Sequence, residues 1–332
     1  MSPNKNKLVM ALDIGGTTIK SGLVDSLGRI IYEIKVPSQA LSGSTFVLEN
    51  IKKVIDKMLQ YAEKNVLSLK SIGISTAGVV DPEKGEIIFA TGTFKGWQGV
   101  SIKENINKYL KLPVYIENDA HAAGWGEKYF GVARNVNDFV MLTLGTGLGG
   151  SIFTRGKLYT GSSNFAGLIG QMNIGFRCIG DNKKDFTEAA CLEDYISANG
   201  MSRMANEIAS EYKESFLAKI ISENNGKISP KEIYIAYKNG DKLASEVIRR
   251  MIIYLGTGII TLLYLLNPEL IVLSGGLSNM KEDLLVPLRK HVREHCPEKL
   301  YKNIKIKLSQ NLENCGFIGA AAIAFSKGIP RI

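Results

Sequence analysis

Apolar residues along this chain come in short runs, several of which end at a glycine turn, and in longer stretches with helical spacing. Residues 8–36 predict three successive strands joined by tight turns, whereas residues 45–64 place apolar side chains at helical intervals. We expect further strands over 71–80, 114–119, 270–276 and 303–309, and helices over 120–130, about 187–222, 243–266 and 317–328. Strands that alternate with helices in this way predict an α/β fold.

The pattern of the first strands returns in the middle of the chain. Residues 139–159 again predict strand, glycine turn, strand, turn and strand, in the order shown by residues 8–36. An internal repeat of this kind indicates two structurally similar units. We therefore expect two lobes, each beginning with a glycine-kinked hairpin that faces a shared cleft.

The composition fits a soluble globular enzyme with a sizeable core. The chain has 332 residues, of which 45% are apolar and 22% charged, so two domains are expected and disorder is excluded. A net charge of +9 would suit a surface that attracts nucleic acid, but the lysines are scattered among acidic residues, without a run of five basic residues. We interpret the charge as a solvated surface and expect no nucleic-acid partner.

Cysteine usage and the longest apolar run bear on cellular location. The four cysteines, at positions 178, 191, 296 and 315, follow no recognisable signal peptide, which favours free thiols in the cytoplasm. The longest apolar run, Met251–Leu266, has 16 residues. A membrane-spanning helix needs roughly 18 or more, so we predict a buried helix there and no membrane association.

Three glycine-rich turns follow apolar strands and indicate a phosphate site. Glycines let a ligand approach the backbone closely, and successive backbone N–H groups form a concave site for anions. Asp13, at the end of the first strand, adds a carboxylate that suits Mg²⁺, usually held through water. Together the turns predict a nucleotide triphosphate between the lobes. The candidate ATP-binding residues are Gly15, Gly16, Thr17, Thr18, Thr146, Gly147, Gly275 and Gly276.

The second of these turns, residues 145–150, also matches the dinucleotide pattern G-x-G-x-x-G. That pattern requires a helix after the turn and an acidic residue about 20 positions further on. Here a strand-like segment follows instead, and the first acidic residue after it is Asp181. A Rossmann dinucleotide site is therefore excluded.

Four stretches resemble, in the right order, the motifs of ROK-family sugar kinases, which belong to the actin-like ATPase superfamily: ALDIGGTTIKSGLVD, ENDAHAAGWGE, LTLGTGLGGSIF and IVLSGGLS. The resemblance runs from about residue 8 to residue 325. It implies two RNase-H-like lobes with ATP and a sugar in the cleft between them. Residues 1–117 and about 317–332 would form the N-terminal lobe, residues 118–316 would form the C-terminal lobe, and the protein would be a homodimer.

Asp119 is the candidate catalytic residue, at the point where a strand meets a helix. Phosphoryl transfer to a sugar hydroxyl needs a carboxylate within hydrogen-bond reach of that hydroxyl. An aspartate at a helix start can instead be a simple N-cap, but the accompanying phosphate turns favour a catalytic base. The resemblance places the general base at Asp119 and a sugar contact at Asn118, whereas the lone His121 is expected to be structural.

The sugar end departs from the ROK pattern. Family members usually carry a segment like A-G-E-x-G-H, followed by a cysteine cluster that binds zinc together with the histidine. Here leucine stands for the glutamate, glutamine stands for the histidine, and two cysteines match the cluster. Because a structural zinc needs four ligands, we predict no zinc. The resemblance implies sugar contacts from Thr93, Asn118, Asp119, Gly167, Gln171 and either Glu188 or Glu193, two alternatives between which the sequence does not decide.

The leucine of this segment, Leu168, bears on the choice of sugar. A site built to bond a hydroxyl rejects analogues that lack it. An apolar side chain in that place tolerates a substituent instead, such as an aglycone or an N-acetyl methyl group. Alternatively, Leu168 faces the core and another group replaces the glutamate.

The resemblance implies an ATP-dependent kinase that phosphorylates the primary hydroxyl O6 of a hexose, with glucose as the first expectation. The departures at positions 168 and 171 favour a β-glucoside or an N-acylhexosamine such as N-acetylmannosamine as alternatives. A non-catalytic ROK sugar sensor is the competing class, although seven residues before the first strand leave little room for a DNA-binding domain. An inactive scaffold is disfavoured because both Asp13 and Asp119 are present.

Overall fold

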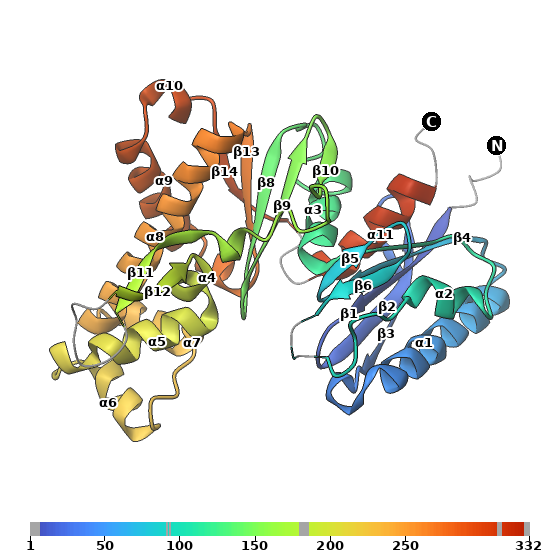
Figure 1. Ribbon diagram of the computed structural model, residues 1–332, viewed down its shortest axis with the longest axis horizontal. Coiled ribbons are helices and arrows are strands. Elements are labelled where there is room, and N and C mark those ends of the chain that lie inside the picture. The colour runs from blue at the N-terminus through green and yellow to red at the C-terminus, as the bar shows by residue number, and fades with distance from the viewer. Residues whose placement is uncertain (1–6, 91, 93, 179–185, 311–313, 329–332) are drawn as a thin grey trace.

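The computed structural model describes residues 7–90, 92, 94–178, 186–310 and 314–328, without the side chains of residues 176–178 and 186–189. Two five-stranded sheets lie in two lobes side by side (Figure 1). The mixed α/β class predicted from the sequence is confirmed.

The first sheet has the strand order β3-β2-β1-β4-β7. β1 to β3 form an antiparallel meander, and β4 and β7 continue the sheet parallel to β1. A hairpin of β5 and β6 follows β4. The bounds are β1 (Leu8–Ile14), β2 (Thr18–Asp25), β3 (Ile30–Pro37), β4 (Leu69–Thr76), β5 (Val79–Asp81), β6 (Glu86–Phe89) and β7 (Val114–Asn118). Because β1, β4 and β7 run parallel, their carboxyl ends meet at one edge, where Asp13 pairs with Ser75 and Thr76 with Asn118.

The second sheet repeats this topology in the order β10-β9-β8-β13-β14. Again three strands form an antiparallel meander and two further strands extend it in parallel. The bounds are β8 (Phe139–Leu144), β9 (Leu148–Thr154), β10 (Lys157–Tyr159), β13 (Leu270–Ser274) and β14 (Lys305–Leu308). The internal repeat predicted from the sequence is thus present in the two sheets.

One predicted helix begins later than expected. The sequence predicts a helix over about 187–222, but Phe186–Cys191 is strand β12, which pairs antiparallel with β11 (Asn173–Cys178). The alanines of this stretch favour a helix locally, and pairing with a partner distant in sequence overrides that preference. The rest of the range is broken into α4 (Glu193–Ile196), α5 (Ala198–Ile208) and α6 (Phe216–Glu223).

Alternate residues of β1 pack on opposite faces of the first sheet, as the two-residue period of a strand requires. Met10 and Leu12 join the core formed with α1 (Ser44–Lys64) and α2 (Ile102–Asn107). Val9 and Ala11 pack against α11 (Cys315–Gly328). The last helix of the chain therefore covers the sheet that its first strands build.

The second sheet is covered on two faces in the same manner. Leu142 and Leu144 of β8 lie in the core around α8 (Lys242–Leu266), with α7 (Pro230–Lys238) and α9 (Glu282–His295) around it; α10 (Glu298–Tyr301) follows α9. Phe139 and Met141 pack on the other face with Ala123 of α3 (Asp119–Tyr129). Each sheet thus has one helix, α11 or α3, on the face toward the other lobe (Figure 1).

Helix α8 contains the long apolar run noted in the sequence. Among the described residues it is the one helix long and apolar enough, by length and composition, to cross a membrane. However, 56% of its most apolar window is buried inside the protein, where it packs against α5, α7 and α9. Its apolar surface therefore belongs to the core of the second lobe.

Helices α3 and α11 pack on each other through glycines and alanines (Figure 1). A Cβ at Gly319 would overlap the carbonyl of Ala122, and one at Gly126 would lie 3.2 Å from the backbone nitrogen of Gly319. On its other side α11 touches β4, where a Cβ at Gly73 would overlap the carbonyl of Ala320. The helices are in backbone contact, so this interface has no room for larger side chains.

The boundary between lobes at residue 117 stays a prediction.

We predict that Gly319→Ala destabilises the protein, because its methyl group must displace the backbone of α3. Overpacking of this kind costs about 1–3 kcal/mol, measurable as the free energy of unfolding in urea. Gly175→Ala is the matched control, since a Cβ there has no neighbour within 4 Å. Equal unfolding curves for Gly319→Ala and wild type would contradict the proposed backbone contact.

Candidate active site

Asp119 lies at the junction of β7 and α3, where the preceding residue performs the capping. Asn118 Oδ1 accepts hydrogen bonds from the N–H groups of Ala120 (2.9 Å) and His121 (3.3 Å), and Asn118 Nδ2 donates to the carbonyl of Gly78 (2.8 Å). Asn118 is therefore the N-cap, and its amide is largely used within the protein. The Asp119 side chain, which accepts from the N–H of Ala120 (2.8 Å), is exposed to solvent and available to a ligand.

Asp13 ends β1 close to Asp119, and its two oxygens differ. Oδ1 accepts a hydrogen bond of 2.8 Å from Ser75, which the parallel pairing of β1 and β4 places opposite it. Oδ2 accepts no hydrogen bond from the residues that the structure describes. A Cβ at Gly316, in the first turn of α11, would lie 2.7 Å from this oxygen. Because glycine has no side chain, position 316 leaves Asp13 Oδ2 accessible to a ligand, as a carboxylate that holds a cation requires.

Both carboxylates are harder to ionise than in water. Burial raises the pKa of Asp13 from 3.8 to about 6; the Ser75 hydrogen bond opposes this rise and the charge of Asp119 adds to it. Solvent reaches the Asp119 side chain, yet the protein around it disfavours the charged form. This desolvation raises the pKa of Asp119 despite the N–H of Ala120 and the nearby His121. The site therefore favours ligands that bring positive charge or a proton to share.

The first glycine turn joins β1 to β2 beside Asp13. The N–H of Gly15 donates to the carbonyl of Thr18 (3.0 Å), and Ser38 donates to the carbonyls of Thr17 and Gly16. The carbonyls thus point into the protein. The N–H groups of Gly16 and Thr17 have no partner among the described residues, and Thr17 and Thr18 are exposed. This arrangement fits the phosphate-binding role expected of Gly15, Gly16, Thr17 and Thr18.

The second and third turns lie next to each other, because β8 and β13 are parallel neighbours. Gly275 has a φ of 90°, and a Cβ there would lie 2.5 Å from the carbonyl oxygen of Leu144. Gly276 begins a short 3-10 helix, Gly276–Met280. In the second turn, Thr146 is exposed and the N–H of Gly145 donates to the carbonyl of Gly147 (3.0 Å).

Cys315, at the start of α11, connects these turns to the carboxylates. Burial raises the pKa of its thiol, which lies close to Ser274 at the end of β13 and feels the charges of Asp13 and Asp119. The ends of β1, β7 and β13 and the start of α11 therefore meet in one place. The structure brings together the predicted magnesium ligand, the predicted base and the three glycine turns.

Glu193 lies at the second turn. Its Oε2 accepts a hydrogen bond of 2.6 Å from the N–H of Leu148, and a Cβ at Gly147 would lie 2.6 Å from the same oxygen. The alternative sugar contact, Glu188, is in β12, and its side chain lies outside the described residues. Thr93 is also outside them. The choice between Glu188 and Glu193 stays open.

A charged network lies behind Asp119 and joins two buried residues to one exposed lysine. Lys327 of α11 is 3.0 Å from Glu117, the other oxygen of Glu117 is 3.5 Å from His121 Nδ1, and His121 Nε2 is 3.1 Å from the carbonyl of Ala166. Glu117 and His121 are 3% and 6% exposed. Although desolvation opposes it, the hydrogen bond from His121 and the charge of Lys327 lower the pKa of Glu117. His121 thus has the expected structural role and fixes residues 166–167 to α3.

The segment after β10 lies against this network. A Cβ at Gly167, which has a φ of 92°, would lie 2.9 Å from His121 Nε2. Leu168 is 41% exposed, so it does not face the core. Gln171 is exposed at the end of the 3-10 helix Ile169–Gln171. Gly167 is therefore placed beside the turn that carries Asp119.

A metal site other than Asp13 would need a cluster of ligating side chains. No cluster of three or more His, Cys, Asp or Glu side chains is found among the described residues. Cys191 donates from Sγ to Asp194 (3.2 Å), and the side chain of Cys178 lies outside the description. The absence of zinc stays a prediction. A magnesium ion would have Asp13 as its protein ligand, with water completing its shell.

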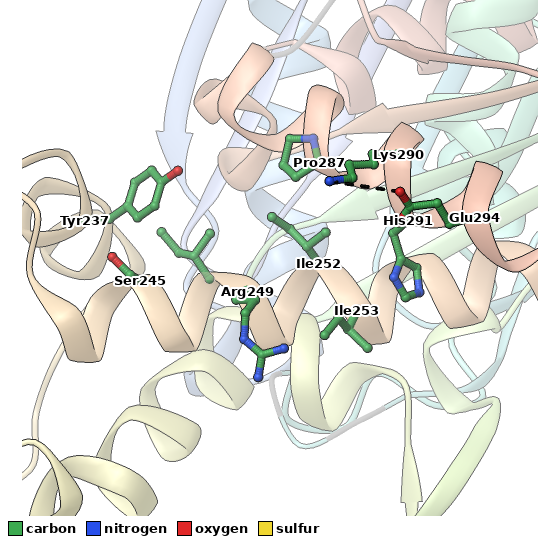
Figure 2. A pocket seen from close by; sticks show the side chains of 10 residues that line it. Tyr237, Ser245, Arg249, Ile252, Ile253, Pro287, Lys290, His291 and Glu294 are labelled. Carbon is green, nitrogen blue, oxygen red and sulfur yellow. Dashed lines mark ion pairs between the residues drawn. The ribbon is translucent and has the colours of Figure 1, made fainter.

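A separate cavity of about 310 Å³ lies in the second lobe (Figure 2). It is lined by residues of α7, α8 and α9, among them Tyr237, Arg249, Lys290 and His291. Glu246 holds Arg249 through two hydrogen bonds of 2.7 and 2.8 Å, and Lys290 faces Glu294. The residues that line this cavity include neither Asp13 nor Asp119. The cavity is therefore separate from the candidate active site, which consists of the two carboxylates and the glycine turns.

Sequence reasoning missed Ser75, Gly316 and Cys315. The position of Ser75 at the end of an apolar strand was a usable signal, because a strand parallel to β1 and next to it ends beside Asp13. Gly316 and Cys315 gave no such signal, because their role depends on how α11 packs against α3.

The chain is similar to known proteins over nearly its whole length. Residues 9–327 match the model of the ROK family. A glucokinase from Halalkalibacterium halodurans is 31% identical over 314 residues, covering 93% of this chain and 92% of that protein. A ROK-family glucokinase from Streptomyces griseus, solved with glucose and AMPPNP, is 30% identical with a TM-score of 0.73, covering 95% of this chain and 98% of that chain.

The relatives also include a regulator. A xylose repressor from Caldicellulosiruptor bescii is 27% identical over 96% of this chain and 78% of the repressor. Because the family model spans nearly the whole described chain and the sheets match the two lobes of ROK kinases, this protein belongs to the ROK family.

Proposed function

We propose that this protein is an ATP-dependent sugar kinase that transfers the γ-phosphoryl group of ATP to O6 of a hexose, as a glucokinase does. The observation that carries the proposal is the pairing of Asp119 with Asp13. Asn118 caps α3, so the Asp119 carboxylate remains available beside a second carboxylate and the glycine turns.

In this reaction Asp119 accepts the proton of the O6 hydroxyl while that oxygen attacks the γ-phosphorus, and ADP departs. The raised pKa of Asp119 brings its proton affinity closer to that needed by a general base near neutral pH. In this proposal the N–H groups of Gly16, Thr17, Thr146 and Gly147 hold phosphate oxygens, and Gly275 and Gly276 lie beside the nucleoside. Mg²⁺ at Asp13 would supply neutralisation of the phosphate charge.

The relatives suggest two alternative functions for this protein, that of a sugar kinase and that of a sugar-responsive repressor. A repressor needs to bind sugar but has no use for a free carboxylate next to a cation ligand. The arrangement of Asp13 and Asp119 therefore supports catalysis. We also propose that the protein acts in the cytoplasm as a homodimer, without zinc, membrane or nucleic-acid partners.

Asp119→Asn is expected to lower kcat by about 10²–10⁴-fold, because the amide cannot accept the O6 proton. ADP release, coupled to a spectrophotometric assay over a panel of hexoses, measures the rate, and calorimetry measures ATP affinity, which should be nearly unchanged. Asp56→Asn, on the exposed face of α1, is the matched control. Wild-type turnover by Asp119→Asn would refute the assignment of the base. Sugar binding without ADP release by the wild-type protein would instead indicate a sensor.

Asp13→Asn is expected to abolish activity yet stabilise the ligand-free protein above pH 6. Because the pKa of Asp13 is about 6 when folded and 3.8 ordinarily, the charged form costs folding free energy that grows between these pH values. Removing the charge should raise the free energy of unfolding at pH 8 by up to about 3 kcal/mol, with no gain below pH 3.8. Urea titrations at both pH values measure this. A gain that is the same at both would show that burial of the charge is not its cause.

A further inference from the structure

Three large apolar side chains are exposed near the proposed catalytic base. Phe89, at the end of β6, is 46% exposed, Phe165 is 44% exposed and Leu168 is 41% exposed. The rings of Phe89 and Phe165 are in contact, with centroids 6.2 Å apart and planes at 49°. Phe89 belongs to the β5–β6 hairpin of the first lobe, whereas Phe165 and Leu168 follow β10 of the second.

Backbone contacts place the segments that carry Phe89 and Phe165 near the turn that carries Asp119. The carbonyl of Phe89 packs against Gly78, whose Cβ would be only 2.7 Å from it, and the carbonyl of Gly78 accepts from Asn118. On the other side, Ala166, next to Phe165, contacts His121 through its carbonyl. The apolar group is thus attached from both lobes to residues 118 and 121, which flank Asp119.

The two segments that carry these side chains contain no charged residue. Residues 87–94 and residues 158–176 contain no Asp, Glu, Lys, Arg or His. Single exposed hydrophobic residues, such as Phe216 in α6, occur on any protein surface and need no function. Two of them in ring contact, with a third exposed three residues further along the same uncharged segment, are a different case, since apolar patches beside a polar site mark binding sites.

We infer that Phe89, Phe165 and Leu168 form an apolar subsite that accepts an apolar substituent on the sugar held at Asp119. The substituent is an aryl or alkyl aglycone, or an N-acyl chain on a hexosamine. This inference rests on the proposed sugar kinase activity. An unsubstituted hexose presents hydroxyl groups that leave the two rings in water, whereas an aryl or acyl group removes their faces from water and gains the hydrophobic contribution of that burial.

The test compares two series of substrates in the wild-type protein. One series is glucose, methyl β-glucoside and phenyl β-glucoside; the other is N-acetyl- and N-butyryl-hexosamines. We expect kcat/KM to rise about tenfold or more with the larger apolar group in one series, which identifies the position of the substituent. Glucose phosphorylation without a rise in either series would overturn the subsite and leave the kinase assignment intact.

Variants show whether the preference arises at these residues. Phe165→Ala should reduce the advantage of the larger substituent to near unity, and Leu168→Ala should reduce it partly. Phe216→Ala, an exposed aromatic residue of α6, is the matched control and should retain the full preference. If Phe165→Ala lowers kcat/KM for all sugars and for ATP alike, the ring pair is a contact between lobes and the inference is wrong.

Direct binding separates this inference from the proposed activity. Calorimetry of phenyl and methyl β-glucoside against wild type and Phe165→Ala needs no turnover. If no sugar yields ADP but phenyl β-glucoside still binds more tightly than methyl β-glucoside, and Phe165→Ala removes the difference, the subsite stands without the kinase. Equal affinity of both glucosides for wild type, together with equal affinity of both N-acyl hexosamines, would overturn it.

Discussion

The backbone contact between α3 and α11 determines where the candidate catalytic groups lie. Each helix covers one sheet, and glycines at 126 and 319 let the two helices approach until main chain meets main chain. This contact sets the start of α11 beside the end of β1 and the start of α3. Asp13, Asp119 and Cys315 come from three distant parts of the sequence, and the packing of small residues is what unites them. A larger side chain in the interface between α3 and α11 would move the carboxylates of Asp13 and Asp119 apart.

The two carboxylates are held together at an electrostatic cost. Burial and mutual repulsion raise the pKa of Asp13, and burial raises that of Asp119. A divalent cation at one carboxylate and a sugar hydroxyl at the other would relieve both effects, so the unliganded arrangement is prepared for its ligands. Behind them, the exposed Lys327 pairs with the buried Glu117, which also contacts the buried His121, so the positive charge of Lys327 compensates the Glu117 carboxylate. The charged forms of Asp13 and Asp119 are therefore disfavoured in the absence of ligand, whereas the charged form of Glu117 is favoured by its neighbours in the protein.

The sequence predicted the features that depend on local pattern. Asp13 and the glycine turns follow apolar strands, and the repeated meander indicated two similar sheets, as the structure shows. It did not reveal that Asn118 caps α3, because aspartate and asparagine suit that position equally. Nor did it reveal the bonds of Glu193 to Leu148 or of His121 to Ala166, which join residues 45 positions apart in both cases. The strand at Phe186–Cys191 was missed for the same reason, since its partner decides its conformation.

Helix α11 is synthesised long after the sheet that it completes. Ser71 of β4 donates to the carbonyl of Ala324, 253 positions later, and Val9 and Ala11 remain uncovered until Phe317 arrives. Contacts between such distant residues form slowly, and uncovered apolar faces promote aggregation of nascent chains. This face of the N-terminal lobe therefore stays incomplete until α11 has been synthesised, and chains that terminate before α11 leave the α11-covered face exposed, although α1 and α2 still cover the opposite face.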